Sequence, residues 1–158
     1  MRRSIALAAT TALALAAMSS SALAVTKEEY KAQVEPICQT NSKANERILK
    51  GVRKMVKDGK LGPAGTKFIQ AGRELKKTYN QLKAVPQPVE DAAKLAKWLG
   101  YVKTEADLFN RAGKKLKAGK KGAAQSDVNK LTTNANQANA TVLAYNFRYC
   151  KFEPSKYT

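Results

Sequence analysis

The chain has 158 residues, a formal net charge of +17 and no histidine. The lack of histidine excludes Ser-His-Asp and Cys-His catalytic arrangements and removes the commonest general base and metal ligand. There is also no C-x-x-C-H haem motif, no glycine-rich phosphate loop and no Glu-x-x-His metal-ligand pair. We therefore expect a protein that is not an enzyme and has no cofactor and no metal site.

The first 24 residues have the three-part pattern of a secretory signal peptide. Arg2 and Arg3 precede an uncharged apolar run over residues 5–18, and Ala22-Leu23-Ala24 is an A-x-A cleavage site. The run is shorter than the roughly 20 residues that a membrane span needs, which argues against an uncleaved anchor. We expect cleavage after Ala24 and a secreted or periplasmic location, with Sec and twin-arginine export both open.

The remaining residues, 25–158, have the length of one domain, and no segment in them is apolar enough to cross a membrane. Their apolar residues recur at steps of three and four, which predicts four helices. The first begins at Thr26, where Glu29 completes a capping box, and ends near Asp58-Gly59. Because Pro36 lacks a backbone N–H, we expect a kink or a break there.

The other three helices are separated by glycine and proline. The second begins near residues 64–66, after a turn at Gly62-Pro63, and stops at Pro86-Gln87-Pro88. The third has Pro88 at its first position and Glu90 and Asp91 in its first turn, and it ends at Ala118-Gly119. The fourth begins between Gly122 and Ser126 and continues to Cys150.

No useful stretch alternates with the period of a strand, so the predicted fold class is all-α. Short connections favour an up-down-up-down four-helix bundle, and a pair of long hairpins at another packing angle remains open. Antiparallel packing across the Pro86–Pro88 turn would place Phe68 opposite Ala106 and Leu75 opposite Leu99.

Cys38 lies in the first predicted helix and Cys150 at the end of the last, which are at the same end of such a bundle. Export permits disulfides, so we predict that this bond joins the first and last helices. In the resulting register, Asn41 faces Asn146 and Ile48 faces residues 138–140. The two asparagines are then a pair that fixes the register, or alternatively part of a polar ligand pocket.

The lysines and arginines suggest a binding surface for a polyanion at the opposite end. The candidate residues are Lys50, Arg53, Lys54, Lys57, Lys60, Lys114, Lys115, Lys117, Lys120 and Lys121. Partners would be anionic lipid headgroups, wall polymers or other polyanions. Lysine strongly outnumbers arginine, so we do not expect sequence-specific nucleic-acid binding. The alternative is a charged surface that serves solubility and helix C-termini.

A second functional hypothesis is a helical carrier of a small apolar ligand. The small residues predicted for the core would leave space between the helices or would allow close helix packing; they are Gly72, Ala92, Ala106, Ala135 and Ala138. A tunnel lined by Phe68, Tyr79, Leu99, Phe109 and Tyr145 would favour the carrier.

Four features together carry a resemblance: Tyr30 with Cys38, the Pro86-Gln87-Pro88 turn, Trp98-Leu99, and Tyr149-Cys150. With them the chain resembles a loosely defined group of small uncharacterised exported helical-bundle proteins of bacteria, which have one Cys in the first helix and one at the end of the last. The resemblance implies a secreted or cell-envelope location, and it implies no activity and no catalytic residues.

Overall fold

The computed structural model describes residues 25–153, so the predicted signal peptide and residues 154–158 lie outside the described residues. Helices account for most of the described chain, and no strand occurs in it. In chain order the elements are α1 (Lys27–Leu49), α2 (Val52–Lys57), α3 (Leu61–Ala84), the 3-10 helix η1 (Val89–Asp91), α4 (Ala92–Lys117), α5 (Lys121–Thr141) and the 3-10 helix η2 (Leu143–Tyr145).

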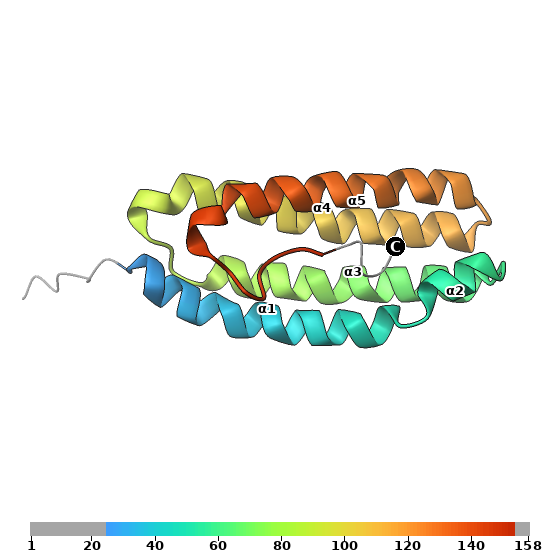
Figure 1. Ribbon diagram of the computed structural model, residues 1–158, viewed down its shortest axis with the longest axis horizontal. Helices are drawn as coiled ribbons and strands as arrows, with labels where there is room; N and C mark the ends of the chain where they lie inside the picture. Colours follow the sequence, from blue (N-terminus) through green and yellow to red (C-terminus); the bar gives the residue numbers. More distant parts are fainter. Residues whose placement is uncertain (1–24, 154–158) are drawn as a thin grey trace, which may run out of the picture.

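The long helices α1, α3, α4 and α5 lie in two layers, with α1 and α3 in one and α4 and α5 in the other (Figure 1). Each long helix runs antiparallel to the long helix before it. The most extensive helix contacts are between α3 and α4, followed by α4 with α5 and α1 with α3. The predicted all-α class and the up-down arrangement of four long helices are thus confirmed.

Helix α1 begins where the capping box predicts. The Glu29 backbone N–H donates to Thr26 Oγ1 at 3.2 Å, and the Thr26 N–H donates to Glu29 Oε2 at 2.8 Å. The helix then passes through Pro36 without a break. Pro36 and Ala32 are both exposed, so the Ala32 carbonyl that Pro36 cannot bond is on the solvent side.

The predicted end of the first helix at Asp58-Gly59 is wrong, because Gly51 interrupts it. Gly51 has a φ of 79°, which a residue without a Cβ adopts at low cost, and α2 follows as a separate short helix. The predicted turn at Gly62-Pro63 is also wrong, since both residues lie in the first turn of α3. Proline is tolerated there because first-turn N–H groups have no intrahelical partner. Pro88 precedes η1 rather than opening the third long helix.

The last helix is shorter than predicted, and Cys150 lies outside it. Helix α5 ends at Thr141, and Asn146, with a φ of 46°, closes η2. The chain then turns back between the two helix layers (Figure 1). We call residues 146–153 the C-terminal segment. It buries Phe147 and Cys150.

The disulfide itself is confirmed. Cys38 and Cys150 are bonded with a Cα–Cα distance of 5.0 Å, and neither cysteine of the chain is free. The bond joins α1 to the C-terminal segment, not to the last helix. The α1–α5 register derived from it is wrong, because these helices make few direct contacts. Asn41 instead accepts a long hydrogen bond, 3.4 Å, from Asn45 on its own helix, and Asn146 is exposed.

Helices α3 and α4 cross with their backbones in contact. A Cβ atom built on Gly72 would lie 2.9 Å from the Ala106 carbonyl oxygen. Gly72 therefore lies opposite Ala106, where the predicted register put Phe68, a difference of one helical turn. Phe68 packs on Phe109 instead, with ring centroids 5.6 Å apart.

Candidate functional site

Two candidate sites emerge, one at the cationic end of the bundle and one in its interior. We use "basic pole" for the ten lysine and arginine residues predicted above, from Lys50 to Lys60 and from Lys114 to Lys121. Helix α2 and the connection between α4 and α5 lie at the same end of the bundle (Figure 1). The structure therefore brings together the two segments that are distant in sequence.

The basic pole contains two turns with the same geometry, which we call the twin turns, residues 59–62 and 119–122. Gly59 and Gly119 have φ values of 75° and 73°. The next residue in each turn, Lys60 or Lys120, is the N-cap of a long helix and makes no side-chain capping hydrogen bond. The Lys60 N–H donates to the Met55 carbonyl at 2.8 Å, and the Lys120 N–H donates to the Lys115 carbonyl at 2.9 Å.

A repeat in the sequence underlies the twin turns and was missed in the sequence analysis. Residues 54–64 read KMVKDGKLGPA, and residues 114–124 read KKLKAGKKGAA. The positions shared by the two stretches are three lysines, two glycines and the final alanine. The equal spacing of these lysines and glycines is the sequence signal for two equivalent turns, and it is visible only when the two stretches are aligned.

Some of the predicted cations have structural partners. Lys115 Nζ lies 2.7 Å from Asp127 Oδ2, and Arg111, on the same helix, lies 3.3 Å from Asp127 Oδ1. Burial by itself would raise the pKa of Asp127, but hydrogen bonding from Lys115 and the charges of both cations hold that pKa below its usual value. Lys54 pairs with Asp58 at 2.7 Å on the surface. Lys115 thus stabilises the α4–α5 hairpin.

All members of the basic pole except Lys115 are exposed to solvent. Helix α1 uses a different cation at its end, since Lys67 Nζ donates to the Ile48 carbonyl at 2.7 Å. The position of Lys67 is therefore explained by a direct contact with the C-terminal end of a helix, as the alternative interpretation of the charged surface expects. Within residues 25–153 no such contact is found for Lys60, Lys120 or Lys121, the lysines of the twin turns.

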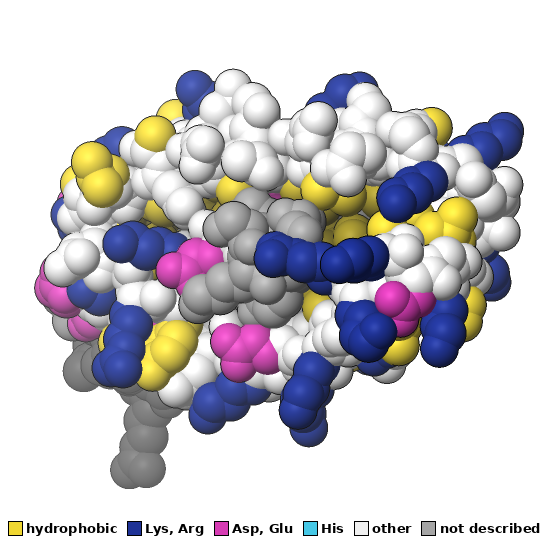
Figure 2. Space-filling model, turned by 45° about the vertical axis from the view of Figure 1, so that its right-hand side comes forward, with side chains coloured by type: hydrophobic (Ala, Val, Ile, Leu, Met, Phe, Trp, Pro, Cys, Tyr) yellow, Lys and Arg dark blue, Asp and Glu magenta, His cyan; other side chains and the backbone are white. Residues whose placement is uncertain are grey.

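A pocket of about 290 Å³ lies between α2 and the start of α5, and we call it the pole pocket. Lys57 and Lys121 stand on its rim. Its apolar lining comes from four different helices and consists of Val52, Val56, Phe68, Leu116, Ala124 and Val128. Hydrophobic side chains are visible in the depression between the two helix layers on the face of Figure 2, with Lys and Arg side chains around it.

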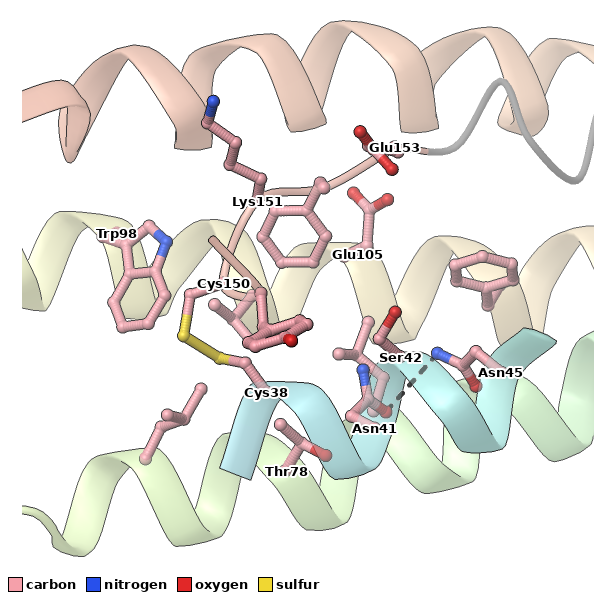
Figure 3. Close-up of a pocket in the computed structure, with 16 residues that line it drawn as sticks. Cys38, Asn41, Ser42, Asn45, Thr78, Trp98, Glu105, Cys150, Lys151 and Glu153 are labelled. Carbon is pink, nitrogen blue, oxygen red and sulfur yellow. Dashed lines mark hydrogen bonds between the residues drawn. A yellow bond between two sulfur atoms is a disulfide. The ribbon is translucent and has the colours of Figure 1, made fainter. Parts of the chain in front are cut away.

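A second pocket, which we call the inner pocket, is lined by α1, α3, α4 and the C-terminal segment and is partly open to solvent (Figure 3). Its volume is about 80 Å³. Glu105 lies on it and is only 1% exposed. The Asn134 side chain donates to Glu105 Oε2 at 2.6 Å. Burial raises the pKa of Glu105 to about 8, against the opposing effect of that hydrogen bond.

Glu105 was not recognised from the sequence, although a signal was present. It follows Trp98 by seven residues and precedes Phe109 by four, so it occupies the apolar stripe of its helix. A carboxyl group at such a position is rare without a partner or a ligand. Its partner Asn134 lies on α5, which has several Asn and Gln residues, so the sequence does not distinguish Asn134 from the others.

The C-terminal segment covers the inner pocket and is held at three places. Glu35 of α1 accepts hydrogen bonds from the Arg148 and Tyr149 N–H groups, the latter at 2.8 Å. Asn139 of α5 donates to the Phe152 carbonyl at 3.1 Å and accepts from the Phe152 N–H at 3.0 Å. The disulfide of Cys150 fixes the middle of the segment.

No protein-family model, curated protein or solved structure matches the chain. Among residues 25–153 no helix is long and apolar enough to cross a membrane. The same residues contain no cluster of three or more His, Cys, Asp or Glu side chains that could hold a metal ion.

Proposed function

We propose that this protein is a non-enzymatic secreted or cell-envelope protein that binds a polyanion through its basic pole. The observation that carries the proposal is the pair of twin turns, which place equivalent lysines and helix starts at one end of the bundle. Anionic lipid headgroups and anionic wall polymers are the polyanions that an exported protein would meet.

The twin turns supply two kinds of attraction for an anion. The first turns of α3 and α5 contain no acidic residue, whereas α1 has Glu28 and Glu29 in its first turn. The N-terminal ends of α3 and α5 therefore keep the positive end of their dipoles uncompensated. Lys60 and Lys120 add full charges at the same positions. Together these groups create a stronger local field than the same charges spread over the surface.

The export of the chain is part of this proposal and has separate support. A disulfide with a sequence separation of 112 residues persists in oxidising compartments and is rare in the cytosol. This agrees with the signal peptide predicted for residues 1–24.

The carrier hypothesis has weaker support. A Cβ atom on Gly72 would clash with the facing helix, so this small residue serves close packing. A tunnel lined by Phe68 and Phe109 among others would have favoured the carrier, but Phe68 lines the pole pocket and Phe109 the inner pocket, and their two rings are in contact. These residues therefore belong to two separate pockets.

Salt-dependent retention on an immobilised polyanion tests the proposal. The pole variant changes five exposed lysines to Gln, namely Lys60, Lys114, Lys117, Lys120 and Lys121. The control variant changes five exposed lysines elsewhere to Gln, namely Lys43, Lys76, Lys83, Lys97 and Lys103. Lys115 is left intact in both variants because it neutralises Asp127.

We expect the pole variant to elute from heparin, and to leave phosphatidylglycerol vesicles, at a clearly lower salt concentration than the control variant. The reason is that binding by counterion release depends on the charges that touch the polyanion. If the two variants elute at the same salt concentration, only the net charge matters and the basic pole is not a binding site.

A further inference from the structure

The inner pocket contains polar groups whose partners the described residues do not supply. Trp98 is 1% exposed, and its Nε1–H has no acceptor among them. Asn45 is 7% exposed, and its Oδ1 has no donor. Both residues line the pocket, and the indole nitrogen of Trp98 is on the side of the ring that faces the C-terminal segment (Figure 3). Groups buried in this way are normally hydrogen-bonded.

The side chains that line the inner pocket favour a positively charged ligand. Two carboxyl groups line it, the buried Glu105 and the exposed Glu153. The one cationic side chain in the lining, Lys151, points away from the cavity (Figure 3). The surfaces of Phe109, Tyr149 and Phe152 complete the wall. Carboxylates with aromatic rings form the usual environment for organic ammonium groups.

The size of the pocket limits the guest to a small molecule. Its volume of about 80 Å³ is several times the roughly 10–15 Å³ that one water molecule requires. A short chain with a single amino group fits this space, whereas a lipid or a peptide does not. A metal ion is less suitable, because the lining offers amides and aromatic rings around only two carboxyl groups.

We propose that the inner pocket binds a small primary alkylammonium ion or amino alcohol. The ammonium group pairs with Glu105 and donates to Asn45 Oδ1, and the carbon chain lies against the aromatic wall. The C-terminal segment closes the pocket over the guest.

Binding of the cation is coupled to a proton. The pKa of Glu105 is raised to about 8, so this carboxyl group is mostly protonated at pH 7 in the free protein. When an alkylammonium ion binds, the carboxyl group loses its proton to the solvent and the carboxylate pairs with the ammonium. The other charged side chains of the lining, Lys151 and Glu153, are exposed on the C-terminal segment. The amides Asn41 and Asn45 of α1 and Asn134 of α5 carry no charge.

Calorimetric titration with n-butylammonium and with ethanolammonium tests this inference on the full mature chain. n-Butanol serves as the uncharged isostere and butyrate as the anion of similar size. Glu105→Gln removes the charge and keeps an oxygen that can accept from Asn134. Asp107→Asn is the matched control, since Asp107 is an exposed carboxylate on the same helix. Circular dichroism establishes that each variant is folded.

We expect both ammonium probes to bind to the wild type and to Asp107→Asn, and to bind roughly 10- to 100-fold more weakly to Glu105→Gln. At pH 7 the measured heat should depend on the ionisation enthalpy of the buffer, because binding releases a proton. Equal binding of n-butanol and n-butylammonium would overturn the inference. So would the absence of binding at millimolar concentrations, which would leave the pocket as a site for water only.

Discussion

Gly65 and Gly113 face each other so closely that a Cβ atom on Gly65 would lie 2.5 Å from the Gly113 carbonyl oxygen. Two of the three nearest atoms belong to the backbone of the facing helix, the Gly113 oxygen and the Lys117 nitrogen, and the backbone cannot move aside as the Lys117 side chain can. This contact sets the distance between α3 and α4, and α4 carries both Glu105 and three lysines of the basic pole, Lys114, Lys115 and Lys117.

Gly113→Ala should destabilise the protein by about 1–3 kcal/mol, because the added methyl group forces the two helices apart. Gly100 is the matched control. It lies in the same helix, and a Cβ atom there would meet nothing within 4 Å. Gly100→Ala should stabilise the protein by about 0.5–1 kcal/mol through the better helix propensity of alanine. Urea unfolding curves measure both changes, and equal effects of the two substitutions would contradict the close crossing.

The disulfide should stabilise the protein mainly by restricting the conformations of the unfolded chain. The bond joins residues separated by 112 positions, and its removal by Cys38→Ser with Cys150→Ser should lower the free energy of unfolding by about 4 kcal/mol. The same variant should lose the protection of the C-terminal segment from proteolysis, since Glu35 and Asn139 then hold it alone. A cleavage rate in this segment equal to that of the oxidised protein would show that the hydrogen bonds suffice.

The fold was predictable where short-range rules decide it and unpredictable where long-range packing does. The Thr26 capping box and the glycine at 119 mark helix ends through their own backbone requirements, and both were placed correctly. The periodic residues after Thr141 fit a helix as well as they fit the observed segment. Burial of Phe147 and the bond to Cys38 decide the outcome there, and neither is a local property.

The two candidate sites also differ in whether short-range sequence features or long-range packing determine them. The cations of the basic pole could be identified from the sequence alone, and the predicted up-down topology placed their two segments at one end of the bundle. The inner pocket depends on the C-terminal segment lying between the layers, so a helix prediction that continued to Cys150 could not reveal it. The partnership of Glu105 with Asn134 likewise requires the actual α4–α5 register.

Glu105 should make the stability of the protein fall as the pH rises. Its pKa is raised in the folded state to about 8, above its usual value of 4.5. The folded chain therefore binds more protons than the unfolded chain between these pH values, and the free energy of unfolding decreases across this interval. Glu105→Gln should remove this contribution. The variant should be more stable than the wild type by about 1–3 kcal/mol at pH 8 and nearly equal to it at pH 4.

Thermal unfolding of both proteins from pH 4 to pH 9 measures the difference. Asp107→Asn again provides the control, because Asp107 is an exposed carboxylate on the same helix. A constant difference between Glu105→Gln and the wild type at all pH values would mean that the pKa of Glu105 is the same in the folded and the unfolded chain.

Hydrogen–deuterium exchange with and without a heparin oligosaccharide tests the central claim, that the basic pole is the binding surface. Our account predicts slower exchange in α2 and at the starts of α3 and α5, including the N–H groups of Gly62 and Gly122 in the twin turns. It predicts no change at the opposite end, around η1 and the start of α1. Slower exchange spread evenly over the exposed lysines of all helices, or confined to the end opposite the twin turns, would contradict the account.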